Sequence, residues 1–492
     1  GINMSVLYVY LAVIIYIIIG TIIAWKAREG LEQGILEYYL GGRKINGIIA
    51  ALSYSATTYS AFMMIGLAGY TYSGGVGALG FELVYLSGLS LVAFFGPRFW
   101  LIGQKNDYLS PYEMLGDRYQ SEWIPVILAA SACIFLIPYL AVQLMGVGYL
   151  MSGLSGGNIP FITGVLIAAV LAIAWALIAG MRSVTWTDSL QSLIMITVSV
   201  LILFFVVYQE FNGFMNFFKT LETDYSRYLS VPGPGFFNLN NFIGLTLPWF
   251  FFSISNPQVS QRLFIPDSLK SMKIMIKGFL IFGLIYTLVS VFWGFTALTL
   301  IPGLDQPDMA TPQLLGSKYV PVSLGLVAMI GITAAAISTI DSIMLTLSSV
   351  LVQDIFGKVK KQSNRVRNGK IIIILIALIG VIFASQKLDL IATLSVASSA
   401  GLLVVVPTIF GAFFWKASTA AGALTSIIAG TITTFILQLG NIQPMGIWPG
   451  VWTLLISSVL FISVSLFTSP PEKKAEEFIG YINQELKKRN IL

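Results

Sequence analysis

Residues 332–342, ITAAAISTIDS, place small residues, hydroxyls and one carboxylate in the middle of the apolar segment 318–355. A helix of that length can cross the roughly 30 Å hydrocarbon core of a bilayer. Polar groups without partners at that depth cost several kcal/mol each. The cluster formed by Ser338, Thr339, Asp341 and Ser342 therefore calls for a functional explanation.

The rest of the chain repeats this apolar character. Of the 492 residues, 56% are hydrophobic and only 10% are charged, which is too little polar surface for a soluble protein. The sequence predicts an all-α polytopic membrane protein with about thirteen transmembrane helices. We expect these spans at 4–26, 46–73, 76–103, 122–153, 161–180, 185–208, 239–262, 272–298, 318–355, 368–386, 390–415, 418–438 and 446–468.

Basic residues predict the orientation of these spans. Of the 28 Lys and Arg, only Lys219, Arg227, Lys318 and Lys387 fall in the loops of one side. Because cytoplasmic loops collect Lys and Arg, this bias places the N-terminus outside and the C-terminus inside. The net charge of +6 then needs no nucleic-acid partner. The tail 469–492 is predicted to form a short amphipathic cytoplasmic helix.

Two spans combine hydroxyls and small residues with Gly or Pro at membrane depth. The second reads ALSYSATTYSAFMMIGLAGYTYSGG at 51–75, and the seventh contains SISNPQ at 253–258. Such composition is typical of discontinuous helices that line a cavity. Because the seventh span comes five positions after the second, an odd number, the two run in opposite directions. We therefore expect two inverted repeats, 46–208 and 239–415, between a peripheral helix at 4–26 and two peripheral helices at 418–468.

Acidic residues within the spans are candidates for cation binding. Asp188 lies near the inner end of the sixth span, and Asp341 and Ser342 share a helical face with Ser338. Carboxylates and hydroxyls are suitable ligands for Na⁺, although aspartates that only bond neighbouring helices remain an alternative. We expect no Lys or Arg at membrane depth to pair with the aspartates, which favours a mobile cation, Na⁺ or H⁺. Glu82, near the outer end of the third span, is expected to reach the headgroups.

Four motifs resemble those of the sodium:solute symporter family, whose members include proline, pantothenate and monocarboxylate transporters. They are Gly41–Arg43, TWTDSLQ at 185–191, NPQVSQRLFIPDS at 256–268 and ITAAAISTIDS at 332–342. The resemblance extends over nearly the whole chain. It implies alternating access and a LeuT-like core of about five plus five helices in inverted repeats.

The resemblance also implies cation sites. A principal Na⁺ site would use the backbone carbonyls of Ala56, Tyr59 and Ala335 and the hydroxyls of Ser338 and Thr339. A second cation site, known in some members, would use Asp188, Ser338, Asp341 and Ser342. Position 341 is a small residue in several relatives, so the extra carboxylate here would bind either a cation or a proton.

Solute-binding residues follow from the same resemblance. We expect Thr58, Ser60, Tyr139, Gln143, Trp249, Ser253 and Asn256 to line the solute pocket. Tyr139 and Trp249 match the pocket of proline-type members, whereas Thr58 replaces an aspartate of those members. Gln143 resembles pantothenate-type and monocarboxylate-type members instead. A small anionic or zwitterionic solute fits both.

These observations predict a Na⁺-coupled symporter of the plasma membrane that imports a small organic solute, such as proline, pantothenate or a monocarboxylate. It is expected to work as a monomer, with Na⁺ as the co-transported ion. A H⁺-coupled symporter using Asp188 and Asp341, or a solute sensor without transport, remains an alternative. An enzyme is not expected, because the chain has no His and a single Cys, so that Ser or Asp would have to serve as nucleophile and base.

Overall fold

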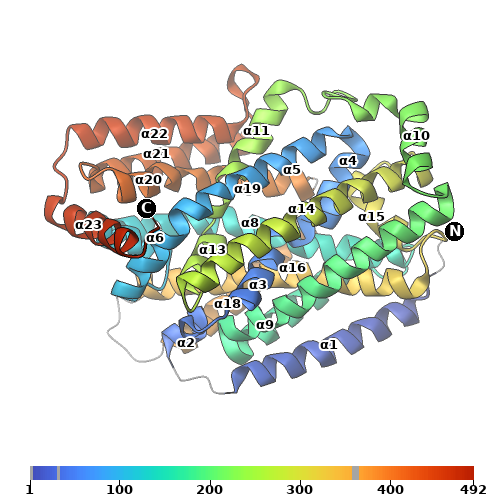
Figure 1. Ribbon diagram of the computed structural model, residues 1–492, viewed down its shortest axis with the longest axis horizontal. Coiled ribbons are helices and arrows are strands. Elements are labelled where there is room, and N and C mark those ends of the chain that lie inside the picture. Colours follow the sequence, from blue (N-terminus) through green and yellow to red (C-terminus); the bar gives the residue numbers. More distant parts are fainter. Residues whose placement is uncertain (1–3, 30–33, 357–364, 390, 492) are drawn as a thin grey trace.

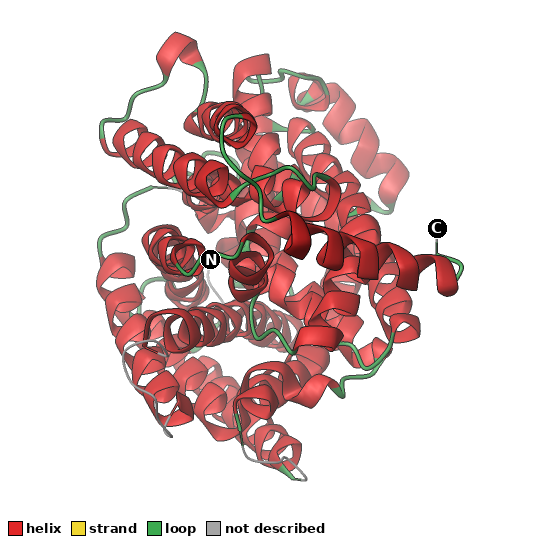
Figure 2. Ribbon diagram, turned by 90° about the vertical axis from the view of Figure 1, so that its left-hand side faces the viewer, coloured by secondary structure: helices red, strands yellow, loops and turns green. Residues whose placement is uncertain are grey.

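In the computed structural model, which describes residues 4–29, 34–356, 365–389 and 391–491, the regular secondary structure is helical (Figure 2). Within these residues, twelve helices are long and apolar enough to cross a membrane. They are built from α1 (Val6–Arg28), α3 (Gly47–Ala61) with α4 (Ala68–Gly74), α5 (Gly77–Gly88) with α6 (Ser90–Asn106), α8 (Trp123–Leu154), α9 (Phe161–Phe211), α14 (Leu269–Leu300), α16 (Val322–Val350), α18 (Arg365–Ser385), α19 (Ile391–Leu402) with α20 (Val406–Phe414), α21 (Ala420–Leu439) and α22 (Pro449–Leu466).

The helix α9 contains two of the predicted spans, 161–180 and 185–208. It divides at Gly180, whose φ of +58° is a left-handed conformation. A Cβ atom there would lie 2.2 Å from the carbonyl oxygen of Tyr38, in the short helix α2 (Ile35–Leu40). Glycine therefore permits both the bend and the close approach of α2.

The seventh predicted span, 239–262, is present but broken. It consists of α11 (Leu239–Phe250), α12 (Phe252–Ser255), α13 (Pro257–Ser260) and the 3₁₀ turn η4 (Gln261–Phe264). Each piece is too short to cross a membrane alone, so this span is not among the twelve. Asn256 has extended backbone angles (φ −90°, ψ 113°), and the helix restarts at Pro257. A proline disfavours the helical conformation of the residue before it and is tolerated at a helix start, which explains the break.

The second span breaks at Ser60, whose φ of 51° and ψ of −169° are not helical. A π-helix, η2 (Phe62–Leu67), joins α3 to α4 beyond this point. The discontinuity predicted from the hydroxyl-rich sequence is therefore confirmed in both spans.

Burial separates central from peripheral helices. In the most hydrophobic stretch of the span Gly47–Gly74, 83% of the residues are buried, and in that of Val322–Gln353, 72% are buried. The corresponding fractions for α1 and α22 are both 28%. The broken second span and α16 therefore lie in the interior, and α1 and α22 present most of their surface to lipid.

The ends of the bundle differ in their connecting elements (Figure 1). One end carries α10 (Phe214–Asp224), α15 (Ala310–Leu315) and the start of α1. The opposite end carries α2 and α23 (Glu472–Lys488). The tail helix predicted from the charged C-terminal sequence is thus present. It buries Phe478, Ile482 and Leu486, and ion pairs join Lys474 to Asp117 (3.0 Å) and Lys105 to Glu477 (3.8 Å).

Asp308 fixes the segment between α14 and α16 at the α10 end. It belongs to the 3₁₀ turn η5 (Pro307–Met309), is 2% exposed, and its Oδ2 accepts a hydrogen bond of 2.8 Å from the backbone N–H of Ile391. Burial is the main cause that raises the pKa of Asp308 from the ordinary 3.8 to about 7; the nearby carboxylate of Asp389 adds to the rise, and the hydrogen bond from Ile391 opposes it. The neutral acid is therefore the form that suits this position.

We expect the wild-type protein to lose thermal stability as the pH rises from about 4 to about 7, and an Asp308→Asn variant to lose less. A carboxyl group with a raised pKa in the folded state stabilises that state fully below its ordinary pKa, and the stabilisation disappears as the pH rises through about 7. Asparagine retains the acceptor oxygen without the charge. Unfolding midpoints of the two purified proteins at each pH measure the difference, and parallel pH profiles would contradict this role of Asp308.

Candidate functional site: a polar crossing of α3, α9 and α16

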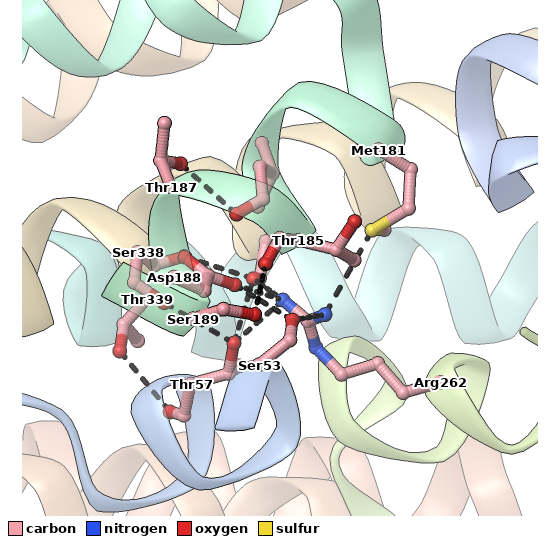
Figure 3. A network of polar contacts seen from close by, with 12 residues as sticks. Ser53, Thr57, Met181, Thr185, Thr187, Asp188, Ser189, Arg262, Ser338 and Thr339 are labelled. Carbon is pink, nitrogen blue, oxygen red and sulfur yellow. Dashed lines mark hydrogen bonds and ion pairs between the residues drawn. The ribbon is translucent and has the colours of Figure 1, made fainter. Parts of the chain in front are cut away.

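Two of the predicted Na⁺-binding residues, Ser338 and Thr339, lie where the broken second span meets α16 (Figure 3). The Thr339 hydroxyl donates to the carbonyl oxygen of Thr57 on α3 (3.1 Å) and to that of Ala335 on α16 (3.2 Å). The hydroxyls of Thr57 and Ser338 are 3.4 Å apart. Ser338 and Thr339 are completely buried and face α3, not lipid.

A small cavity adjoins this crossing. Its lining includes Ala56, Tyr59 and Ala335, three of the five predicted Na⁺ residues, together with Ser60 and Ser192. It has room for about one water-sized particle. A dehydrated alkali ion is of comparable size, so the cavity and the two hydroxyls beside it form a plausible seat for Na⁺.

The break at Ser60 is stabilised locally by two side chains. The Ser60 hydroxyl accepts a hydrogen bond of 3.1 Å from the N–H of Phe62, and the Gln143 amide oxygen accepts one of 3.1 Å from the N–H of Ala61. Backbone donors freed by an interrupted helix need such partners inside a membrane. Gln143, predicted as a solute residue, therefore also supports the discontinuity.

Three residues of the predicted second cation site also come together, but an arginine lies among them (Figure 3). Arg262 is 3% exposed and pairs with Asp188, with its Nη2 atom 3.3 Å from the Asp188 Oδ2 atom. The Ser53 hydroxyl donates to the same Oδ2 atom (2.8 Å), and the hydroxyls of Thr57 and Ser342 are 3.1 Å apart. Our expectation that no Lys or Arg pairs with the aspartates is therefore wrong for Asp188. The distribution of basic residues assigns Arg262 to the cytoplasmic side, at the end of the predicted span 239–262, whereas in the structure its side chain is buried in the core.

Asp341, the fourth member of the predicted set, is separate from this network. It is 1% exposed, and neither of its carboxylate oxygens has a hydrogen-bond partner among the residues that the structure describes. Buried carboxylates are normally hydrogen-bonded, ion-paired or protonated. Both oxygens of Asp341, and the Oδ1 atom of Asp188, are therefore left to accept a proton or a cation.

The predicted solute residues are all buried, and some of them lie close together. The indole N–H of Trp249 donates to the carboxylate of Glu82 on α5 (3.3 Å). The ring of Phe252 lies 5.0 Å from that of Trp249 and 6.2 Å from that of Tyr139, measured between centroids.

The expectation that Glu82 reaches the headgroups is wrong, because its side chain is 1% exposed. Because Glu82 lies near the end of an apolar run, its position in the sequence does not show that its side chain points into the interior.

Several of these residues have polar atoms without a hydrogen-bond partner in the described part of the chain. They are the Thr58 hydroxyl, the Gln143 amide nitrogen, the Ser253 hydroxyl and the Asn256 amide nitrogen. Buried polar groups are rarely left unpaired in the absence of a ligand or water. The arrangement therefore offers both donors and acceptors to a small polar molecule.

Comparison with known proteins decides the family. The family model described as the sodium:solute symporter family matches residues 38–430, most of the chain. The chain belongs to the sodium:solute symporter family.

Relatives of this symporter match over nearly their whole lengths. The sodium/pantothenate symporter of Escherichia coli (strain K12) is 26% identical over 487 residues, which cover 95% of this chain and 98% of the relative. The sodium/proline symporter of Staphylococcus aureus (strain JH9) is 24% identical over 495 residues, covering 94% and 93%. The solved structure of a Na⁺-coupled sialic acid symporter, substrate-bound and outward-open, has a TM-score of 0.78 at 18% identity and covers 94% of this chain and 98% of that chain.

These findings confirm the predicted fold class, location and coupling ion. The symporter has the LeuT-like fold of its structural neighbours and is a multi-pass protein of the plasma membrane. Its relatives are transporters, and Na⁺ is the co-transported ion.

Proposed function

We propose that this protein imports a small organic solute together with Na⁺ by alternating access. Na⁺ is held by the carbonyls of Ala56, Tyr59 and Ala335 and by the hydroxyls of Ser338 and Thr339. The observation that carries the proposal is the crossing itself: Thr339 bonds the broken helix α3 beside a cavity that three of these residues line. Hard oxygen ligands in a buried site suit an alkali ion.

Coupling follows from the position of the ion between two elements. Na⁺ at the crossing stabilises the contact of α3 with α16, and α3 ends at the break that Ser60 and Gln143 border. When α3 and α16 are in contact, the solute residues lie in the arrangement that binds the solute. If Na⁺ raises solute affinity tenfold, the coupling free energy is about 1.4 kcal/mol, and solute raises Na⁺ affinity by the same factor.

The solute is proposed to contact Thr58, Ser60, Tyr139, Gln143, Trp249, Ser253 and Asn256. An amino acid such as proline, pantothenate or a monocarboxylate matches the mixture of aromatic and polar groups. Glu82, beside Trp249, favours a solute that carries an amine or another donor, because its carboxyl oxygens accept hydrogen bonds and an adjacent ammonium group, unlike a second carboxylate, would stabilise its ionised form. A zwitterion is therefore preferred over a simple anion.

A proton-coupled symporter is the second candidate, because Asp341 is buried and lacks hydrogen-bond partners in the described structure. In that case Asp341 carries the coupling proton.

We also propose, for either ion, that the protein acts as a monomer without enzymatic activity or a nucleic-acid partner. The repeats 46–208 and 239–415 rock against each other, and the N-terminus faces outward and the C-terminus inward.

Two measurements test this function. Thermal-shift screening should find that one small amino acid or carboxylate stabilises the purified protein more when Na⁺ is present than when choline replaces it. In proteoliposomes, an inward Na⁺ gradient should then drive accumulation of that solute. Accumulation driven by a pH gradient without Na⁺ would favour the proton-coupled alternative, and binding without accumulation would favour a sensor.

A further inference from the structure

The side chain of Gln261 joins three parts of the chain that are far apart in sequence. It lies in η4, directly after the broken seventh span. Its amide nitrogen donates to the carbonyl oxygen of Leu109 (2.8 Å) and to the Ser349 hydroxyl on α16 (3.1 Å). Its amide oxygen accepts a hydrogen bond of 2.7 Å from the Thr346 hydroxyl, also on α16. All four residues are buried, so these bonds are protected from water.

The partner Leu109 belongs to the cytoplasmic end of the bundle in the proposed orientation. It lies in the short connection between α6 and α7 (Pro111–Tyr119). Both of these helices are joined to the tail helix α23, through the ion pairs of Lys105 and Asp117. The bonds of Gln261 therefore lie on the cytoplasmic side of the polar crossing.

The helix α16 connects Gln261 to the proposed Na⁺ site. Thr346 and Ser349 follow Thr339 by roughly two to three helical turns. The Ser349 hydroxyl donates in turn to the carbonyl oxygen of Thr346 (2.8 Å), which fixes both side chains. Because a carbonyl oxygen only accepts, the nitrogen of the amide must face Leu109 and its oxygen must face α16. The orientation of α16 thus sets the orientation of the amide.

The bond from Gln261 to Leu109 crosses the boundary between the two proposed repeats. Leu109 belongs to 46–208, whereas Gln261 and α16 belong to 239–415. A second contact crosses the same boundary nearby: the amide nitrogen of Gln353, in η6 (Leu351–Phe356), donates to the Glu113 carboxylate on α7 (3.3 Å). Rocking that opens the cytoplasmic side has to separate these partners.

We propose that Gln261 is the latch of the cytoplasmic gate, and that its bond to Leu109 breaks each time solute is released. The proposal rests on the alternating access of the proposed function. Loss of Na⁺ from the crossing frees α16 to shift, and the shift of Thr346 and Ser349 turns the amide away from Leu109. Gln261 is a positioning residue and binds neither Na⁺ nor solute.

Labelling of a cysteine in the solute pocket tests the latch from each side of the membrane. The reporter is Ser253→Cys in a Cys133→Ser background, since Cys133 is the single cysteine of the chain and Ser253 is buried. In inside-out vesicles, Gln261→Leu should speed labelling by a membrane-impermeant maleimide roughly two- to tenfold, the effect of losing one net hydrogen bond. In right-side-out vesicles it should not speed labelling.

Two further variants control this measurement. Gln258→Leu makes the same substitution in the preceding helix α13, at a buried side chain without a hydrogen-bond partner among the described residues, and should leave the rate unchanged. Thr346→Val removes only the bond to the amide oxygen and should give a smaller rise from the cytoplasmic side. It tests the latch even if Gln261→Leu does not fold. Gel filtration and unfolding midpoints establish that each variant is folded.

Three results would overturn the latch: unchanged labelling from the cytoplasmic side, an equal rise in Gln258→Leu, or a rise from both sides of the membrane. A rise from both sides would indicate general loosening of the bundle. Failure of the proposed function is a different result. In that case the wild-type protein shows no Na⁺-driven uptake of any solute screened, and labelling of the reporter does not respond to Na⁺.

Discussion

Thr339→Val should raise the Na⁺ concentration required for half-maximal solute uptake by roughly ten- to a hundredfold, equivalent to about 1.4–2.8 kcal/mol of binding free energy. Valine keeps the shape of threonine and removes the hydroxyl oxygen. In the wild-type protein that hydroxyl bonds the carbonyl oxygens of Thr57 and Ala335. Its loss takes away both a proposed Na⁺ ligand and a bond between α3 and α16.

Thr333→Val is the matched control for this prediction. Thr333 is also buried in α16, and its hydroxyl has no hydrogen-bond partner among the described residues. It lies two residues before Ala335, and side chains two positions apart do not share a helical face. Uptake by both variants is compared over a range of Na⁺ concentrations at fixed solute. A Na⁺ dependence of Thr339→Val like that of the wild-type protein, or an equal change in Thr333→Val, would remove Thr339 from the site.

The broken helices were predictable because their sequences contradict a continuous lipid-facing span. The hydroxyl run from Ser53 to Ser60 and the Asn256-Pro257 step place backbone-bonding side chains and a helix breaker at membrane depth. The contact of Ser338 and Thr339 with α3 was instead predicted from the family resemblance. Periodicity shows which residues share one helical face but not which neighbouring helix that face contacts.

The burial of the Arg262 and Glu82 side chains could not be predicted in this way. Each lies near the end of an apolar run, where a charged side chain usually reaches water or headgroups. The break at Asn256 turns the following residues inward, so that Arg262 meets Asp188 from a different span. Glu82 likewise finds Trp249, which is distant in sequence. Partners of this kind depend on the packing of helices, and one sequence alone does not specify that packing.

Gly88→Ala should destabilise the protein by about 1–3 kcal/mol, the usual cost of overpacking. A Cβ atom at Gly88 would lie 2.1 Å from the backbone carbonyl oxygen of Phe250, at the end of α11. Backbone cannot rotate away as a side chain can, so α5 and α11 must separate. Because Glu82 lies on α5 and Trp249 on α11, their contact of 3.3 Å should be lost as well. We therefore expect weaker solute binding together with a lower unfolding midpoint.

Gly80→Ala in the same helix separates this steric effect from the general effect of alanine. A Cβ atom there would lie 3.5 Å from the ring of Phe242, which is an ordinary van der Waals contact. Alanine is favoured over glycine within helices by roughly 0.5–1 kcal/mol, so Gly80→Ala should be neutral or stabilising. Unfolding midpoints and solute affinities of the two variants give the comparison. Equal behaviour of Gly80→Ala and Gly88→Ala would mean that the close approach of α5 to Phe250 does not hold Glu82 against Trp249.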